Sequence, residues 1–462
     1  MAPFARHSFV VKSGTIVRMM GTKEKQYLCI DLKSFYASVE CVDRSLDPLT
    51  TDLVVADPTR TEKTICLAVS PSLKAKGVRN RCRVFEIPKT MRYIMAKPRM
   101  ARYIEVSAEI YSIYLSWMSK DDIHVYSIDE AFFDVTPYLS LYGMSARELG
   151  ERIREDVVEK TGIPATCGVG PNLYLAKVAL DITAKHSPDF FGELTEESYR
   201  RELWGHRPLT DFWRVGAGTA RRLAELGIYT MGQLAIAPTG PIFDALGIDA
   251  EILIDHAWGI EPVEMRHIKA YRPQTHCLTN AQVFGCDYTF KQARTVIKEM
   301  AETVALELVE KRKAASSVVI WAGYGLTPEE RAQLRATGGE HYWWGAPSDG
   351  GTLRFISPTS SRSQVLDGVL HLYDSHISRS RMVHRLSVTL DGVIDDDAPG
   401  VQMDLFSNPA ALEQEHKRLE TVNAIKERFG KNSLLKGIDL LPEATARERN
   451  RQIGGHASGQ SD

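Results

Sequence analysis

The strongest constraint in this sequence is a set of short apolar runs that end in acidic residues. Tyr27–Ile30 runs directly into Asp31, and two further strand-like runs, His124–Ile128 and Ala131–Val135, are separated only by Asp129-Glu130. Apolar runs of this length, bounded by polar residues, are typical of buried β-strands. Carboxylates at the ends of such strands must either reach solvent or share a cationic partner.

Helical patterns fill the gaps between these runs. Ser34 is a good N-cap for the helical spacing at Phe35, Val39 and Val42. A second helix is expected around Ile104–Trp117, where apolar residues recur on one face.

A capping box, Ser145-Ala-Arg-Glu148, opens a third helix that stops at Gly162, and the strand Ala165–Val169 follows. The order is then β-α-β-β-α-β with a large insertion after the first helix, which is the ferredoxin-like arrangement. The first and third strands of such a unit lie side by side. We therefore expect the three acidic residues to converge on one spot.

The second half of the chain repeats this order. Residues 191–262 look helical and self-contained, and the stretch between Gly323 and Gly351 reads as an inserted loop. From Asp395 an Asp-Asp-Asp-Ala-Pro-Gly run marks a domain end, followed by a linker and a helical stretch at about 409–429. The expected elements of the second unit are strands at 277–284, 316–321, 352–356 and 385–390 and helices at 287–312 and 363–375.

The composition indicates a soluble globular protein of several domains, with 462 residues, 44% hydrophobic and 25% charged. No apolar run is long enough to span a membrane, and the N-terminus does not resemble a signal peptide. Seven cysteines without CxxC spacing indicate free thiols in a reducing cytoplasm. The net charge is −2, but residues 265–390 hold 16 Lys+Arg against 11 Asp+Glu, an excess compatible with phosphate contacts.

The acidic residues themselves suggest a metal site. Crowded carboxylates raise one another's pKa unless a cation neutralises them. Oxygen ligands suit Mg²⁺, and two such ions can activate a hydroxyl and stabilise the leaving oxygen of an in-line displacement. An acid at a strand end is more often solvated or a cap, and for Asp31 alone that is the simpler interpretation. Its convergence with Asp129 and Glu130 favours the metal site.

Two segments closely resemble the catalytic motifs of the Y-family DNA polymerases, the DinB/UmuC group. They are Cys29–Glu40 and Tyr126–Val135, and the Ser-Ile-Asp-Glu turn of the second is very specific to that family. The resemblance continues at Gly168–Lys177 and Val215–Ile228 and covers most of the chain. Ala68–Lys74 looks more like the bacterial UmuC-like branch than the DinB branch.

The resemblance implies a multidomain α+β fold. It would comprise a ferredoxin-like palm with a fingers insertion, a helical thumb with a helix-hairpin-helix element, a second ferredoxin-like (βαββαβ) little-finger domain and a flexible C-terminal tail. The expected boundaries are 1–23 for an N-terminal extension, 24–34 and 101–190 for the palm, 35–100 for the fingers, 191–262 for the thumb, 272–394 for the little finger and 395–462 for the tail.

The same resemblance implies a function. The chain would be a template-dependent, error-prone DNA polymerase that bypasses lesions in the cytoplasm, without proofreading, as part of the DNA damage response. It would act as a monomer on primer-template DNA and dNTP with two Mg²⁺ ions, or Mn²⁺ in their place. Asp31 and Asp129 would bridge both ions. Glu130 would bind the ion that activates the primer 3′-hydroxyl, and the Leu32 carbonyl would complete the site of the nucleotide-bound ion.

Nucleotide contacts follow from the same likeness. Tyr36 falls at the steric-gate position, where an aromatic face under the sugar leaves no room for a 2′-hydroxyl. Phe35 beside it would lie near the nucleotide, although a core role is more usual for such a residue. Lys74 and Lys185 fall where the family places basic residues against the triphosphate, and a solvated lysine is the plainer interpretation of each. Pro71 departs from the tyrosine of the DinB branch, so we assign it no role.

Two further segments suggest binding partners. Gly216, Gly218 and Thr219 open a helix whose free N–H groups suit a DNA phosphate, as in a helix-hairpin-helix element, or they form a simple tight turn.

The segment Gln402-Met-Asp-Leu-Phe406 resembles the pentapeptide by which bacterial polymerases bind the sliding clamp of the beta type. Gln402 is followed by two apolar anchors, Leu405 and Phe406, which would need a pocket if exposed. A short tethered peptide of this kind raises the effective concentration of an enzyme at the primer end. The alternative is that both anchors dock on their own domain.

Two other functions remain open. Nucleotide cyclases also use a palm-type fold with two aspartates, but they have no need of a thumb-like element or a clamp peptide. A non-enzymatic DNA-binding or clamp-binding accessory protein would have no need of three carboxylates beside a gate aromatic. Primer extension with labelled dNTP separates the polymerase from both.

Overall fold

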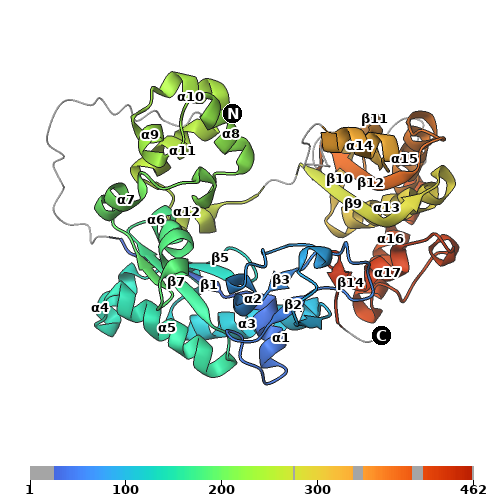
Figure 1. Cartoon of the computed structure of the whole chain (residues 1–462). Helices are drawn as coiled ribbons and strands as arrows, with labels where there is room; N and C mark the ends of the chain where they lie inside the picture. Colours follow the sequence, from blue (N-terminus) through green and yellow to red (C-terminus); the bar gives the residue numbers. More distant parts are fainter. Residues whose placement is uncertain (1–24, 274–275, 337–346, 398–408, 460–462) are drawn as a thin grey trace. The chain divides into compact units, whose positions relative to one another are not determined.

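The computed structural model describes residues 25–273, 276–336, 347–397 and 409–459 (Figure 1). It forms two compact units. The first holds the chain up to Tyr271 except Arg99–Ala101, and the second holds that short segment and the chain from Arg272 onward. Within the described ranges, no helix has both the length and the apolarity that a membrane crossing requires. The seven cysteines are free thiols, as predicted.

The first unit is built on a five-stranded sheet, which we call the first sheet, with strand order β5-β6-β1-β7-β8. Strand β1 lies between β6 and β7 and is antiparallel to both. The prediction that the first and third strands of the β-α-β-β-α-β unit are neighbours is therefore confirmed. The strands are β1 (Tyr27–Leu32), β5 (Ile123–Val125), β6 (Glu130–Asp134), β7 (Ala165–Gly170) and β8 (Phe191–Glu193).

The helices of this unit begin and end close to the predicted positions. Helix α5 carries the predicted capping box, in which the Ser145 hydroxyl accepts from the Glu148 amide at 3.2 Å and the Glu148 carboxylate accepts from the Ser145 amide at 2.7 Å. Gly162 ends the helix with φ of 69°, a conformation that glycine adopts without strain. The helices are α1 (Phe35–Val42), α3 (Met100–Trp117), α4 (Thr136–Tyr142), α5 (Ala146–Thr161) and α6 (Leu173–Val178).

Two further parts complete the first unit. The insertion between α1 and α3 holds a small sheet, β3-β2-β4, formed by β2 (Leu53–Val55), β3 (Ala68–Val69) and β4 (Ile94–Ala96), with helix α2 (Pro71–Ala75). Beyond β8 the chain is helical, and its core around Tyr199, Leu223 and Leu253 is continuous with Tyr174 and Leu175 of α6. These helices are α7 (Glu196–Leu203), α8 (Ala217–Glu225), α9 (Met231–Ile236), α10 (Thr239–Leu246), α11 (Asp249–Trp258) and α12 (Met265–Ala270).

The second unit contains the repeated β-α-β-β-α-β order on another antiparallel sheet, which we call the second sheet, with strand order β11-β10-β12-β9. The segment between Gly323 and Gly351, predicted as a loop, includes helix α14 (Pro328–Ala336) and the start of β11. The remaining elements are β9 (Cys277–Tyr288), α13 (Phe290–Glu310), β10 (Lys313–Tyr324), β11 (Ser348–Thr359), α15 (Arg362–His376), β12 (Val383–Asp391) and β13 (Ile394–Asp395).

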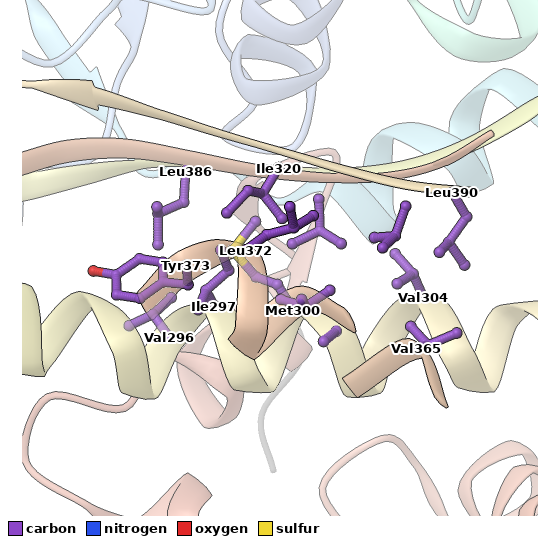
Figure 2. Close-up of a cluster of buried hydrophobic side chains, with 14 of the residues drawn as sticks. Val296, Ile297, Met300, Val304, Ile320, Val365, Leu372, Tyr373, Leu386 and Leu390 are labelled. Atoms are coloured by element: carbon purple, nitrogen blue, oxygen red, sulfur yellow. The ribbon is translucent and has the colours of Figure 1, made fainter. Parts of the chain in front are cut away.

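The core of the second unit lies between its sheet and the helices α13 and α15. Figure 2 shows Ile297 and Met300 of α13 and Leu372 of α15 pointing toward Ile320 and Leu386 of the strands. These side chains are almost completely buried. Burial of this apolar face is the main force that holds the helices on the sheet.

The C-terminal segment is more ordered than the flexible tail that the sequence predicted. Its described part contacts α13, where buried Glu302 pairs with Arg362 and with Lys436 of the segment, and Glu299 accepts hydrogen bonds from Thr445. The segment thus supplies partners to carboxylates that burial would otherwise destabilise. It comprises α16 (Pro409–Phe429), the short helix η6 (Gly437–Leu440), α17 (Ala446–Asn450) and the strands β14 (Gln452–Ile453) and β15 (His456–Ala457).

Candidate active site

The three acidic residues predicted to converge lie together at one end of the first sheet. In the antiparallel pairing of β1 with β6, Asp31 is directly opposite Glu130. The Leu32 amide donates to the Asp129 carbonyl at 2.9 Å, which ties the turn of the β5–β6 hairpin to the end of β1. Glu130 is the first residue of β6, so the hairpin turn is longer than the acidic pair alone and ends at Asp129. Residues a hundred positions apart in sequence therefore share one site.

Two lysines that follow β7 hold these acids. The Lys177 ammonium lies 2.9 Å from both carboxylate oxygens of Glu130, and its side chain is only 8% exposed. Lys185 lies 3.6 Å from Asp31. Asp181, between the two lysines in sequence, contacts Lys177 at 3.0 Å and Lys185 at 2.7 Å. The site is therefore an alternating row of negative and positive groups.

The pKa of the Asp31 carboxylate is raised in this site. Burial is the main reason that its pKa is raised to about 7; Lys185 acts in the opposite direction, and the charges of Asp129 and Glu130 add to the rise. Burial opposes the positive charge of Lys185, but Asp31 and Asp181 outweigh it and raise the pKa of this ammonium. An additional cation beside the acids would relieve their repulsion.

The acids of the site are the groups that would have to supply the ligands of a divalent ion. As placed, the described side chains include no group of three or more His, Cys, Asp and Glu residues that could hold a metal. The physical reason is that Glu130 and Asp31 face lysines, while one Asp129 oxygen accepts from the Ser127 hydroxyl at 2.6 Å. These neighbouring oxygen donors nonetheless fit a hard divalent cation, provided that the side chains turn from their present partners.

The two aromatic residues of α1 are placed differently. The Tyr36 ring stacks on Tyr103 at 4.5 Å between centroids, and it lies near Asp129 and Arg81, whose charges respectively raise and lower its pKa after the larger effect of burial. Phe35 is 2% exposed and belongs to the core. The nucleotide contact predicted for Phe35 is not supported by this position, because its ring is covered by protein.

The lysine predicted on the fingers insertion reaches the same end of β1. Lys74 of α2 donates to the Ser34 hydroxyl at 2.9 Å. Ser34 occupies the N-cap position of α1, but φ is 47° and its side chain makes no capping bond, which corrects the expectation from sequence. Burial lowers the pKa of Lys74, and nearby Lys185 lowers it further, whereas Asp31 and Asp129 raise it. Two ammonium groups from separate elements thus lie near the acids.

The glycine motif of the helical part opens helix α8. Gly216 is the N-cap, and Gly218 and Thr219 lie in the first turn rather than in a loop before the helix. A Cβ atom at Gly216 or Gly218 would meet no other atom within 4 Å. Neither packing nor a positive φ therefore requires glycine at these positions, and the helix N-terminus is open to a ligand.

The residues predicted to bind the clamp, Gln402, Leu405 and Phe406, lie outside the described residues. Two residues of the site were not predicted from the sequence. Lys177 and Asp181 were not singled out, yet they make direct contacts within the site. Their spacing of four residues, continued by Lys185, was the available signal.

Comparisons with known proteins agree with this geometry. The impB/mucB/samB family matches residues 30–181, which span β1 to the lysine-bearing segment. The chain is 30% identical over 437 residues to a protein named "Putative UV-damage repair protein UvrX" of Bacillus subtilis (strain 168), covering 94% of this chain and 98% of that protein. It is 29% identical over 440 residues to "DNA polymerase IV 2" of the same organism, covering 94% and 99% respectively.

The fold has a solved counterpart. A Y-family DNA polymerase chimera superposes with a TM-score of 0.58 at 21% identity, over 80% of this chain and 99% of the chimera. The relatives match over nearly their whole length, the family match covers residues 30–181, and the fold is shared with a solved structure. These findings lead to one assignment. The chain belongs to the Y family of DNA polymerases, in its impB/mucB/samB group.

Proposed function

We propose that this protein is a DNA-directed DNA polymerase of the lesion-bypass type, which extends a primer opposite damaged template without proofreading. The observation that carries the proposal is the register of β1 with β6, which sets Asp31 opposite Glu130 and beside Asp129. Nucleotidyl transfer requires little covalent chemistry from the protein. It requires positioned groups and stabilisation of charge on the phosphates, which acids with adjacent lysines can supply.

The acids would hold two divalent ions, Mg²⁺ or Mn²⁺. When bound, such ions lower the pKa of the attacking hydroxyl and neutralise charge on the leaving oxygen. Asp31 and Asp129 would bridge both ions, Glu130 would bind the one next to the primer 3′-hydroxyl, and the Leu32 carbonyl would contribute to the nucleotide side. The raised pKa of Asp31 is consistent with this assignment, because burial is its main cause and the charges of Asp129 and Glu130 add to it, and a bound cation would offset both effects.

The nucleotide would lie between the fingers insertion and the first sheet. Lys74 and Lys185 would bind its triphosphate, since both ammonium groups lie near Asp31 from different elements. Tyr36 would pack under the deoxyribose and exclude a 2′-hydroxyl. Its stacking on Tyr103 supports this role, because the stack limits how far the ring can retreat.

DNA would be bound mainly through phosphates, and binding would therefore weaken steeply with salt. The N-terminus of α8, with Gly216, Gly218 and Thr219, would contact the backbone without reading its sequence. Gln402, Leu405 and Phe406 would bind the sliding clamp, with the polymerase acting as a monomer alongside cytoplasmic DNA. Replacing both Leu405 and Phe406 by Ala should reduce processivity only when clamp is present.

Primer extension on intact and abasic templates tests the proposal. Wild type should extend both with Mg²⁺, and Asp129→Ala should extend neither while it unfolds at the same temperature as wild type. Tyr36→Ala should incorporate ribonucleotides that wild type rejects. Full activity of Asp129→Ala would end the assignment of the site, and rejection of ribonucleotides by Tyr36→Ala would end the gate role.

A further inference from the structure

One group in the site has no part in the function proposed above. Asp181 lies in a widened helical turn, Ala179–Thr183, that follows α6. Its carboxylate accepts hydrogen bonds from Lys177 at 3.1 Å and from Lys185 at 2.7 Å through the same oxygen, and the second oxygen lies 3.0 Å from Lys177. Both lysines are four residues away in sequence, so the three side chains lie on one helical face.

These contacts connect Glu130 with Asp31 through a continuous row of charged side chains. Glu130 contacts Lys177, Lys177 contacts Asp181, Asp181 contacts Lys185, and Lys185 approaches Asp31. Asp181 is the only acid of the row that is bonded to both lysines. It is also the one acid of the row that the metal site does not use.

The row creates a conflict when the acids bind cations. If Glu130 and Asp31 turn toward divalent ions, each lysine loses a carboxylate partner. Lys177 is 8% exposed and cannot move into water instead. A buried ammonium without a partner is strongly destabilising, and a cation placed nearby makes its position worse. Some other acid must therefore neutralise the lysines.

We propose that Asp181 is a positioning residue that keeps Lys177 and Lys185 paired while Glu130 and Asp31 hold the divalent ions. It acts through the lysines and touches neither the nucleotide nor the ions. By holding Lys185 beside Asp31, it also keeps that ammonium within reach of a triphosphate. This inference rests on the proposed function, because it concerns the same site.

The test compares Asp181→Asn with a matched control in the same unit. Asp156 of α5 pairs with Lys160 four residues away at 2.8 Å and is 18% exposed, close to the 21% of Asp181, but it lies outside the site. Asp156→Asn therefore removes an i,i+4 helical ion pair outside the site, together with the hydrogen bond that Asp156 accepts from the Trp117 indole at 3.0 Å. Asparagine keeps the size of the side chain in both variants, so packing changes little.

The readout is Mn²⁺ binding, followed by electron paramagnetic resonance, to a complex of enzyme, dideoxy-terminated primer-template and dNTP, in which no turnover occurs. We expect Asp181→Asn to raise the half-saturating Mn²⁺ concentration roughly tenfold, the effect of losing a hydrogen bond to a charged group. Asp156→Asn should leave it unchanged. Equal Mn²⁺ binding by Asp181→Asn and wild type, or an equal loss in both variants, would overturn the inference.

A double-mutant cycle tests whether Asp181 acts through the lysine. In the background of Lys177→Met, which removes one of the two charges that Asp181 serves, Asp181→Asn should weaken Mn²⁺ binding less than it does alone. Additive effects of the two substitutions, in variants that unfold at the wild-type temperature, would contradict the inference. A wild type that neither binds Mn²⁺ in this complex nor extends primers would overturn the proposed function as well, whereas failure of the variants beside an active wild type concerns Asp181 alone.

Discussion

The first and second sheets share one order of elements along the chain but not one order of strands in space. In the first sheet the third strand of the unit, β6, pairs with the first, β1. In the second sheet the first strand, β9, pairs with the fourth, β12, and the third strand, β11, lies at an edge. The β-α-β-β-α-β pattern therefore predicts which elements exist but does not by itself determine which strands are neighbours.

This difference determines where chemistry is available. Pairing of β1 with β6 sets two acids opposite each other at a strand end, where lysines and a turn surround them. The second sheet has no comparable pair at its strand ends among the residues described there. Its distinctive side chains, Trp321 and Arg385, lie instead on neighbouring central strands, with the guanidinium 5.1 Å from the ring centre. The same pattern thus brings acids and lysines together at a strand end of one sheet, and an arginine and a tryptophan together on the central strands of the other.

The largest expected effect tests whether the position of an acid matters or only its charge. Asp31→Asn should reduce the rate of primer extension on the order of 10³-fold or more, because a positioned charge at the reacting phosphate is lost. Asp391→Asn removes an exposed acid from the corresponding end of β12 and should leave the rate unchanged. Single-turnover extension under saturating dNTP measures both. Similar losses in the two variants would mean that the two sheets do not differ as described.

The second largest expected effect is on the stability of the two units, measured by substitutions in their buried cores. Ile297→Ala removes a completely buried side chain from α13 and should destabilise the second unit by about 2–5 kcal/mol. Ile153→Ala in α5 does the same for the first unit. Calorimetry should show one transition shifted in each variant and the other unchanged. A single transition that shifts equally in both would show that the units do not unfold separately.

A smaller effect follows from the pKa of Asp31, which folding raises to about 7. A carboxyl group with a raised pKa stabilises the folded state fully below its unfolded pKa, and this contribution is lost as pH rises through the folded value. Between about pH 4 and pH 7, wild type should lose about 2–4 kcal/mol more than Asp31→Asn. Urea denaturation in EDTA measures this difference, and parallel curves for the two proteins would contradict it.

Local patterns predicted the elements well where the deciding interactions are close in sequence. The capping box of Ser145 and Glu148 and the stop at Gly162 defined α5 within a residue. Short apolar runs that end beside acidic residues located β1 and β6. These features depend on bonds within one turn or on the exposure of one face, which a single segment of sequence records.

Contacts between distant segments were not predictable in this way. The buried carboxylates of Glu299 and Glu302 have partners, Thr445 and Lys436, that come from the C-terminal segment far along the chain. The Ser34 hydroxyl makes no capping bond and instead accepts from Lys74, forty residues later. In each case the deciding group lies on another element, and no local period reveals it.

The smallest expected effect sharpens the account of the second sheet. Leu386 of β12 is buried against the helices, so its neighbour Arg385 faces the opposite side, where Trp321 also lies. If this face meets DNA phosphates, Arg385→Ala should weaken binding by about 1 kcal/mol and reduce the slope of log affinity against log salt by about 1. Fluorescence anisotropy with labelled primer-template over a range of salt measures both quantities.

Arg294 provides the matched control for this prediction, because it belongs to the same unit but pairs with Asp374 at 2.7 Å between α13 and α15. Arg294→Ala removes an arginine of similar exposure from the helix side and should change neither the affinity nor the salt slope. If both variants lose affinity equally, the second unit attracts DNA through its overall charge rather than through one face. The contrast between the charged strand end of the first sheet and the face of the second that carries Trp321 and Arg385 would then hold for the structure but not for binding. If only Arg385→Ala weakens DNA binding and reduces the slope of log affinity against log salt, the second unit binds DNA through the sheet face that carries Arg385.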